Sequence, residues 1–289
     1  MNKKLKFFAL HFSWIALLFF VQSCDVIDEP VIGVRNTFDG EVPEFTPLNA
    51  PTRVVLLEDF TGHDCGNCPI AHGIATTLLI AYEDELAVIA IHAGSLAEPF
   101  PPSYPDDWST PEGTFYLLDQ IGSDQLPTGR LNRVNGANFA LSPSQWTNKL
   151  NQEFAKPLPP LGMQIVAEYF ADQNKINVHV NSQWFENKSG DYRLVILLAE
   201  SGIIAPQLNY TVDPTYIPDY EHNHMLRTSL TGATGLSLTT NPIAGDIKTD
   251  SYSLAWNSLW TPENCEIIAF VTEGEGGEVI NAVKTKLTP

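Results

Sequence analysis

The sequence predicts two folded parts, an α/β domain at residues 51–157 followed by an all-β sandwich at residues 160–289. Two near-continuous apolar runs on either side of a helical stretch indicate a parallel β-α-β unit in the first part. After the prolines at 157, 159 and 160, about seven short apolar runs without helical periodicity favour strands.

The chain begins with a segment typical of bacterial export. Three lysines precede an uncharged run of about 15 residues, which is shorter than the roughly 20 that a helix needs to span a bilayer. The run ends in the sequence VQSC at residues 21–24, and small residues before a cysteine resemble the cleavage and acylation site of bacterial lipoproteins. We predict a signal peptide at residues 1–23 and a lipid on Cys24; ordinary cleavage beside an unmodified Cys24 is the alternative.

Residues 24–50 are predicted to be a lipidated tether, because they contain three prolines, several acids and no helical or strand period. The lipid on Cys24 would anchor the protein to the outer membrane, on either its periplasmic or its surface face. The acids directly after it, at 25, 28 and 29, fit either a signal for surface display or a solvated segment.

The composition excludes a nucleic-acid-binding protein. The chain has 34 acidic and 16 basic residues, a formal net charge of −18, and its scarce lysines and arginines form no basic stripe. With 44% hydrophobic residues it is long enough to bury one large or two ordinary cores.

The first elements of the α/β domain follow one another directly. Residues 53–60 form an apolar run of strand length, residues 61–69 a loop, residues 70–82 a stretch with helical spacing, and residues 86–92 a second apolar strand. Such a β-α-β unit is expected to cross over in the right-handed sense.

The remainder of this domain is less regular. Residues 94–111 are a proline-rich, aromatic and acidic insertion without a period. We expect a short helix at 112–121 and a strand at 128–134 after it. A last helix at 142–155 would have Ser142 as its N-cap and Pro143 at its first position.

The second part consists of apolar runs of strand length separated by turn residues, which is typical of an immunoglobulin-like sandwich. The predicted strands are 163–170, 175–183, 191–199, 222–230, 251–257, 266–272 and 279–284.

The sequence Cys65-Gly66-Asn67-Cys68 lies between the first strand and its helix. Two cysteines at this spacing can be half of a zinc site, a structural disulfide or a redox pair. The zinc interpretation needs two more ligands, and only His63 and His72 lie near, on awkward sides of the motif. A strand-to-helix junction favours the redox pair, because helix-end amides stabilise a thiolate.

Asp59-Phe60, four residues and Cys65-Gly66-Asn67-Cys68 together resemble the Asp-Phe-x4-Cys-Gly-x-Cys pattern of thioredoxins. The resemblance implies a thioredoxin-like domain in which Cys65 attacks, Cys68 resolves and Asp59 is a buried acid that relays a proton. It also implies that Pro127 is the family's cis-proline, although only about 5–6% of X-Pro bonds are cis. The alternative for Asp59 is an exposed carboxylate at a strand edge.

Two residues depart from the thioredoxin pattern. Asp64 replaces the aromatic residue that usually precedes the first cysteine, and its negative charge opposes thiolate formation at Cys65. Pro69 fits an early helical turn but is not the commonest residue there.

A wider resemblance covers most of the exported chain. It is carried by the motifs EDFTG at 58–62, CGNCP at 65–69, IHAG at 91–94, LPTG at 126–129, NR at 132–133 and HNHMLR at 222–227. Together these are similar to the 28-kilodalton outer membrane protein family of Bacteroidetes lipoproteins. The resemblance implies a thioredoxin-like domain joined to a β-sandwich, with adhesin or receptor roles at the cell surface.

Other residues are candidates for substrate contact. His92 ends a strand at the sheet edge where ligands bind in open α/β sheets, and Tyr104 and Trp108 in the insertion could flank Cys65 together with Phe100. The alternatives are a strand-end histidine satisfied by the backbone and a loop that binds nothing.

Three further residues could carry chemistry outside this motif. His222 and His224 alternate on a predicted strand with Glu221 nearby, which gives either a weak metal site or a structural pair. Cys265 is predicted to be a buried free thiol.

The sequence leaves two functions open. One is envelope thiol-disulfide exchange through Cys65 and Cys68, with Asp59 and Pro127 in support. The other is a non-enzymatic binding or adhesion module with a structural Cys65–Cys68 disulfide. We expect no cofactor and no resident metal; the partner would be an unidentified protein or peptide, and self-association into a homo-oligomer stays open.

Overall fold

The computed structural model describes residue 38 and residues 40–288, which belong to one compact unit. The predicted signal peptide, Cys24 and most of the predicted tether before residue 40 lie outside the described residues.

The predicted β-α-β unit is present. Strand β1 (Val55–Thr61) pairs in parallel with β2 (Leu86–His92), and helix α1 (Cys68–Tyr82) connects them. Strand β3 (Thr128–Leu131) adds antiparallel to β1, and helix α3 (Trp146–Phe154) follows it. Both strands β1 and β2 are buried along their full length, which explains their near-continuous apolar sequences.

The connecting segments are short and irregular. A helical turn η1 (Ser95–Ala97) opens the insertion, and helix α2 (Pro111–Thr114) continues directly into η2 (Phe115–Ile121). Before α3, turn η3 (Pro143–Gln145) begins with proline, and the Ser142 N–H donates to the Gln145 side chain at 3.1 Å. The sequence signals for this helix start are therefore confirmed.

All seven predicted strands of the second part exist, with shifted ends. They are β4 (Leu161–Phe170), β5 (Lys175–Trp184), β6 (Asp191–Glu200), β9 (Met225–Ser229), β11 (Ile247–Ala255), β12 (Cys265–Glu273) and β13 (Val279–Lys286). The structure adds β7 (Ile203–Leu208), β8 (Tyr216–His222), β10 (Leu236–Thr240) and a turn η4 (Pro262–Asn264).

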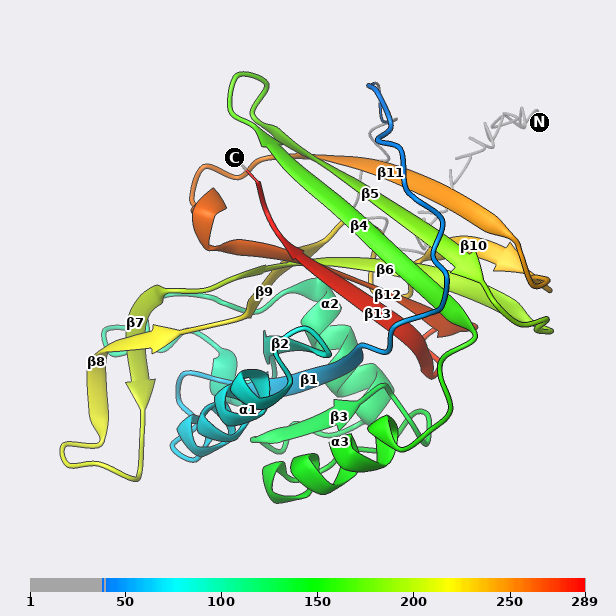
Figure 1. The fold of residues 1–289 in the computed structure, drawn as a ribbon. Helices are drawn as coiled ribbons and strands as arrows, with labels where there is room; N and C mark the ends of the chain where they lie inside the picture. The colour runs from blue at the N-terminus through cyan, green and yellow to red at the C-terminus, as the bar shows by residue number, and fades with distance from the viewer. Residues whose placement is uncertain (1–37, 39, 289) are drawn as a thin grey trace, which may run out of the picture. The chain divides into compact units, whose positions relative to one another are not determined.

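One mixed sheet runs through both parts of the chain (Figure 1). Its order is β13-β12-β6-β9-β2-β1-β3, with β10 also paired to β6. The two parts meet where β2 lies beside β9 through the Ala90–Met225 pair. A second sheet, β11-β5-β4, packs on the β6, β12 and β13 side through a separate apolar cluster.

The observed fold is thus β-rich, with a mixed sheet and few helices, and it does not confirm an immunoglobulin-like sandwich. The division into domains at residues 157–160 stays a prediction, since strands from both sides of it share this sheet.

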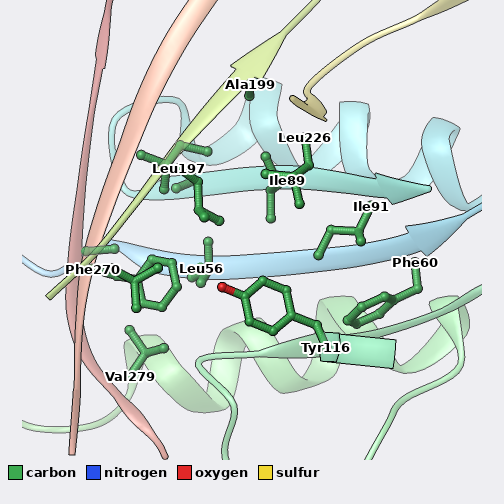
Figure 2. Packing of buried hydrophobic residues seen from close by; sticks show 14 of the residues in the cluster. Leu56, Phe60, Ile89, Ile91, Tyr116, Leu197, Ala199, Leu226, Phe270 and Val279 are labelled. Atoms are coloured by element: carbon green, nitrogen blue, oxygen red, sulfur yellow. The ribbon is translucent and has the colours of Figure 1, made fainter. Parts of the chain in front are cut away.

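The principal core joins side chains from both parts (Figure 2). Leu56 of β1 and Ile89 of β2 lie in the same buried cluster as Leu197 of β6 and Phe270 of β12. Tyr116 of η2 closes this cluster and donates its hydroxyl hydrogen bond to the Ala233 carbonyl at 2.8 Å. Burial of these side chains therefore stabilises both parts at once.

A buried ion-pair network stands at the edge of that core. Glu58 accepts hydrogen bonds from Arg130 and Arg133, and all three side chains are at most 2% exposed. The two guanidinium groups lower the pKa of Glu58 to about 2, against the opposing effect of its burial. The Arg133 guanidinium also lies 4.4 Å from the Tyr116 ring centroid and 4.9 Å from that of Phe270.

Strands β7 and β8 form a separate antiparallel hairpin, residues 203–222, which we call the arm (Figure 1). The arm connects β6 to β9 and reaches toward helix α1. The prediction of one strand over 222–230 is wrong in its first three residues. His222 ends β8, and His224, with a φ of 57°, separates it from the start of β9 at Met225.

None of the helices in the described ranges combines the length and the apolar character that crossing a membrane requires.

Candidate functional site

The Cys65–Cys68 pair forms a disulfide at the junction of β1 and α1. Cys65 lies in the loop after β1 and Cys68 is the first residue of α1, followed by Pro69 in the first turn. Cys65 is 2% exposed and Cys68 is fully buried. The sequence therefore placed the pair correctly at a strand-to-helix junction, but neither sulfur is open to solvent in this state.

The Leu126–Pro127 bond is cis. Thr128, the next residue, pairs with Phe60 near the end of β1, so Pro127 lies at the edge of the sheet from which the loop carrying Cys65 leaves. The geometry agrees with the cis-proline that the thioredoxin resemblance implies.

Asp59 is buried on β1 and is 1% exposed, so it is not an exposed carboxylate at a strand edge. Its Oδ1 atom has no hydrogen-bond partner in the part of the chain that the structure describes. Burial raises the pKa of Asp59 well above its usual range, which favours the protonated form of the side chain.

A cavity of about 210 Å³ reaches Asp59 from the side of α1 and β8. His72 stands in its wall, with one ring nitrogen 2.8 Å from the Tyr220 hydroxyl and the other 2.9 Å from Thr61 Oγ1. Burial, with His222 nearby, lowers the pKa of His72 to about 3, so its ring is neutral. Asp59 therefore borders a polar cavity whose wall also contains His72, Tyr220 and Glu221.

The arm covers the loop that carries Cys65. The Leu208 N–H donates to the His63 carbonyl and the Tyr210 N–H donates to the Gly66 carbonyl, each at 2.8 Å. The buried Gln207 side chain donates to the carbonyls of Gly62 at 3.2 Å and Cys65 at 3.1 Å. These contacts account for the low exposure of Cys65.

The insertion flanks the same loop from another side. The Tyr104 ring stacks on His63 at a centroid distance of 4.7 Å, and the Asp64 N–H donates to the Leu96 carbonyl at 3.0 Å. Trp108 lies instead against Arg227, whose guanidinium is 5.3 Å from the ring centroid. Of the predicted substrate contacts, the structure therefore brings Tyr104, but not Trp108, to the loop of Cys65.

His92 is 2% exposed and faces His222, with ring centroids 5.4 Å apart. Neither ring nitrogen of His92 has a hydrogen-bond partner among the described residues, whereas the His222 ring lies beside the backbone of Ala205 and Pro206. Burial, with neighbouring histidines, lowers the pKa of His92 well below its usual range and that of His222 to about 4. The predicted role of His92 in a substrate groove stays a prediction, because its ring is enclosed in this state.

The structure separates the two histidines proposed as a weak metal site. His222 packs on His92, whereas His224 Nδ1 lies 3.0 Å from Glu266 Oε1. Over residues 38 and 40–288, no group of three or more His, Cys, Asp or Glu side chains is arranged to hold a metal ion.

Cys265 is a buried free cysteine, as predicted. Its Sγ lies 3.3 Å from the Thr261 carbonyl, and burial raises the pKa of the thiol to about 12. Such a thiol is inert in exchange.

Sequence reasoning missed Gln207 and Tyr210, two arm residues that contact the loop of Cys65. The segment 203–208 does carry a short apolar run, but its proline and its distance from the cysteines gave no reason to place it there. The pairing that brings it to the loop is visible only in the structure.

Residues 116–289 match the sequence model of the family described as outer membrane protein Omp28. This chain belongs to the Omp28 family. The resemblance expected from the motifs is thereby confirmed, and membership supports a location at the outer membrane. The matched region begins after Cys65 and Cys68, so membership says nothing about their chemistry.

Among solved structures, the Omp28-family chain is similar to HBP35 of Porphyromonas gingivalis. The two are 20% identical with a TM-score of 0.65, and the match covers 82% of this chain and 76% of that chain, which shows a shared fold. A domain of the outer membrane lipoprotein Omp28 from Porphyromonas gingivalis is 25% identical over 46% of this chain and 92% of its own, with a TM-score of 0.32. No curated protein matches significantly.

Proposed function

We propose that this Omp28-family protein is an outer-membrane lipoprotein, held by a lipid on Cys24, whose Cys65–Cys68 pair exchanges disulfides with a partner polypeptide. The observation that carries the exchange activity is Asp59, an acid buried on β1 whose Oδ1 atom has no hydrogen-bond partner among the described residues. A static disulfide gains nothing from such a group, whereas a resolving cysteine needs a proton source. For the anchor, a Cys24→Ser variant should leave the membrane fraction.

The described structure is the oxidised state, so exchange would begin with a partner dithiol. A partner thiolate attacks Cys65 Sγ, the Cys65–Cys68 bond breaks, and Cys68 leaves as a thiolate that takes the proton of Asp59. The second partner thiolate then attacks the partner's own sulfur in the mixed disulfide and releases Cys65. The partner loses two electrons and becomes a disulfide, while the pair gains them. The Cys65 thiolate and the Asp59 carboxylate then take up from solvent the two protons that the partner dithiol released, which leaves two thiols and a protonated Asp59.

A second candidate function is a surface binding or adhesion module in which the disulfide is static. The burial of both sulfurs favours it, because exchange needs a path to a sulfur atom. The two candidates differ in the reduction potential of the pair.

We expect the Cys65–Cys68 pair to have a midpoint potential between about −120 and −270 mV, the span of thioredoxin-like catalysts. The measurement is equilibration of the purified protein in defined thiol buffers, followed by acid quenching, alkylation under denaturing conditions and mass counting of modified cysteines. A Cys24→Ser, Cys265→Ser background keeps the count to the two cysteines of interest.

A potential below about −300 mV would contradict exchange and leave the static disulfide as the function of the pair. The control is the Cys65→Ser, Cys68→Ser variant in the same background, which contains no cysteine and should show no alkylation.

Replacing Asp59 with asparagine should slow reduction of the disulfide by a dithiol by about 100-fold, the lower end of what a positioned acid contributes. Asparagine keeps the shape of the side chain but has no acidic proton for the Cys68 thiolate. Stopped-flow measurement of tryptophan fluorescence or quenched alkylation at neutral pH gives the rate.

Asp64→Asn is the matched control for Asp59→Asn. Asp64 lies beside Cys65 on the loop, and removing its charge eases approach of a thiolate, so this variant should react at least as fast as the unmodified protein. Equal slowing by both variants would contradict a proton-donating role for Asp59.

A further inference from the structure

The arm occupies the part of the loop 62–66 that an exchange partner would have to approach. We propose that the arm is a lid that imitates a bound substrate, and that the substrate is an extended polypeptide segment that displaces the arm from this loop. The proposal rests on the exchange function above and names its substrate class.

The arm is joined to the loop by backbone hydrogen bonds. Leu208 and Tyr210, two residues apart, both direct their N–H groups to carbonyls of the loop, those of His63 and Gly66. Alternate residues of an extended chain point their N–H groups to the same side, so this is how a peptide docks on an exposed backbone edge. Any extended polypeptide can supply the same two donors.

The arm also places two side chains on the loop. Gln207 is fully buried and donates to the carbonyls of Gly62 and Cys65. The Tyr210 ring lies on Gly66, where an added Cβ would come within 2.6 Å of the ring. The loop therefore accepts a side chain with a hydrogen-bond donor and, three residues later, an aromatic ring.

The apolar side chains near the end of β7 are exposed, and the other contacts of the arm, such as Tyr220 with His72 and Tyr216 with the Ser103 carbonyl, come from β8. Ile204, Tyr210 and Val212 of the arm are 60%, 62% and 43% exposed, and the β7–β8 sheet has only two strands. Segments with few buried apolar groups open at low free energy. Its exposed apolar side chains, with Phe100 of the insertion at 66%, also offer contact surface to an arriving polypeptide.

The first test is the rate at which a phosphine reductant opens the disulfide of the purified full chain in detergent. Tris(2-carboxyethyl)phosphine reduces disulfides irreversibly, so the rate reports access to the sulfurs and does not depend on the midpoint potential. Gln207→Ala removes the side-chain donor to two loop carbonyls, and we expect reduction roughly 10- to 100-fold faster.

Gln183→Ala is the matched control. Gln183 also bridges backbone groups through its side chain, at Leu48, but lies in the second sheet away from the arm. Its variant should be reduced at the unmodified rate. If Gln207→Ala fails to fold, Tyr210→Ala serves instead, because that side chain is 62% exposed, and several-fold faster reduction is expected.

The second test is binding of a fluorescent peptide with the sequence of residues 204–211 to the oxidised protein. We expect binding to Gln207→Ala at least 10-fold tighter than to the unmodified protein, since the variant's loop is more often uncovered. A peptide with Leu208→Pro and Tyr210→Pro lacks both N–H donors and should not bind.

An unchanged reduction rate in Gln207→Ala would overturn the lid. Faster reduction without peptide binding, or equal binding of the proline peptide, would overturn the docking of an extended segment. Neither test measures the midpoint potential of the Cys65–Cys68 pair. A failure of the exchange function would be detected by that separate measurement.

Discussion

Replacing Glu58 with glutamine will lower the free energy of unfolding by about 3–5 kcal/mol, the range for removing one partner of a buried ion pair. Arg130 and Arg133 are 2% and 1% exposed, so without Glu58 two guanidinium groups stay buried with no opposite charge beside them. Urea denaturation monitored by circular dichroism at neutral pH measures the change.

The same network gives this prediction a pH dependence of known sign. The pKa of Glu58 is lowered to about 2 in the folded protein, so its contribution is present above the unfolded pKa near 4.3 and is lost as pH falls toward 2. The difference between the unmodified protein and Glu58→Gln should therefore narrow only below about pH 4.

Glu278→Gln is the control, because Glu278 forms an ion pair with Lys156 in which both side chains are more than 40% exposed. Removing this exposed ion pair should lower the free energy of unfolding by no more than about 1 kcal/mol. A Glu58→Gln variant as stable as this control would show that the network does not hold the edge of the core.

Acidification from pH 8 to pH 5 will destabilise the protein through three buried histidines. His72, His92 and His222 have lowered pKa values in the folded state, so the unfolded chain takes up protons first as pH falls below about 6.5. Each then removes about 2 kcal/mol of stability by pH 5, or about 6 kcal/mol together.

Other ionisable groups also affect how the free energy of unfolding depends on pH. Asp59 and Glu112 have pKa values raised by burial, so they bind protons more readily when folded and oppose the loss on acidification. Arg227 keeps its charge throughout and, with His63, lies near His92. We expect a net loss of several kcal/mol in urea unfolding series at pH 8, 6.5 and 5.

The Asp59→Asn variant is a useful comparison, because it removes one of the groups whose protonation stabilises the folded protein in acid. The free energy of unfolding should therefore fall more steeply between pH 8 and 5 in this variant. Stability that is constant over this range in both proteins would contradict the neutral, buried state of the three histidines.

The sequence predicted those elements whose local signals agree with their surroundings. β1 and β2 are buried on both faces, and their near-continuous apolar sequences alone are enough to predict buried strands. The start of the last helix was equally local, since Ser142, Pro143 and Gln145 satisfy each other. Pro127 was assigned only through the thioredoxin resemblance, and its cis bond agrees with that assignment.

The arm and the shared sheet could not be predicted, because both depend on pairing between distant segments. Ala90 of β2 pairs with Met225 of β9, which lies 135 residues later in the chain. The local sequence of neither strand indicates this pairing. The same holds for Leu208 and His63. The sequence predicted substrate contacts around Cys65 without the arm, whereas the structure shows the arm covering the loop of Cys65.

The continuous sheet has a consequence for how such proteins can arise. Side chains from β1 and β2 share one core with those from β6 and β12, so a gene fragment ending near residue 157 would encode strands whose apolar faces lack their cover. A gene exchange that moved either part alone would therefore leave an apolar face uncovered. A substitution at Leu56 can therefore alter the packing around Phe270, 214 positions away in the chain.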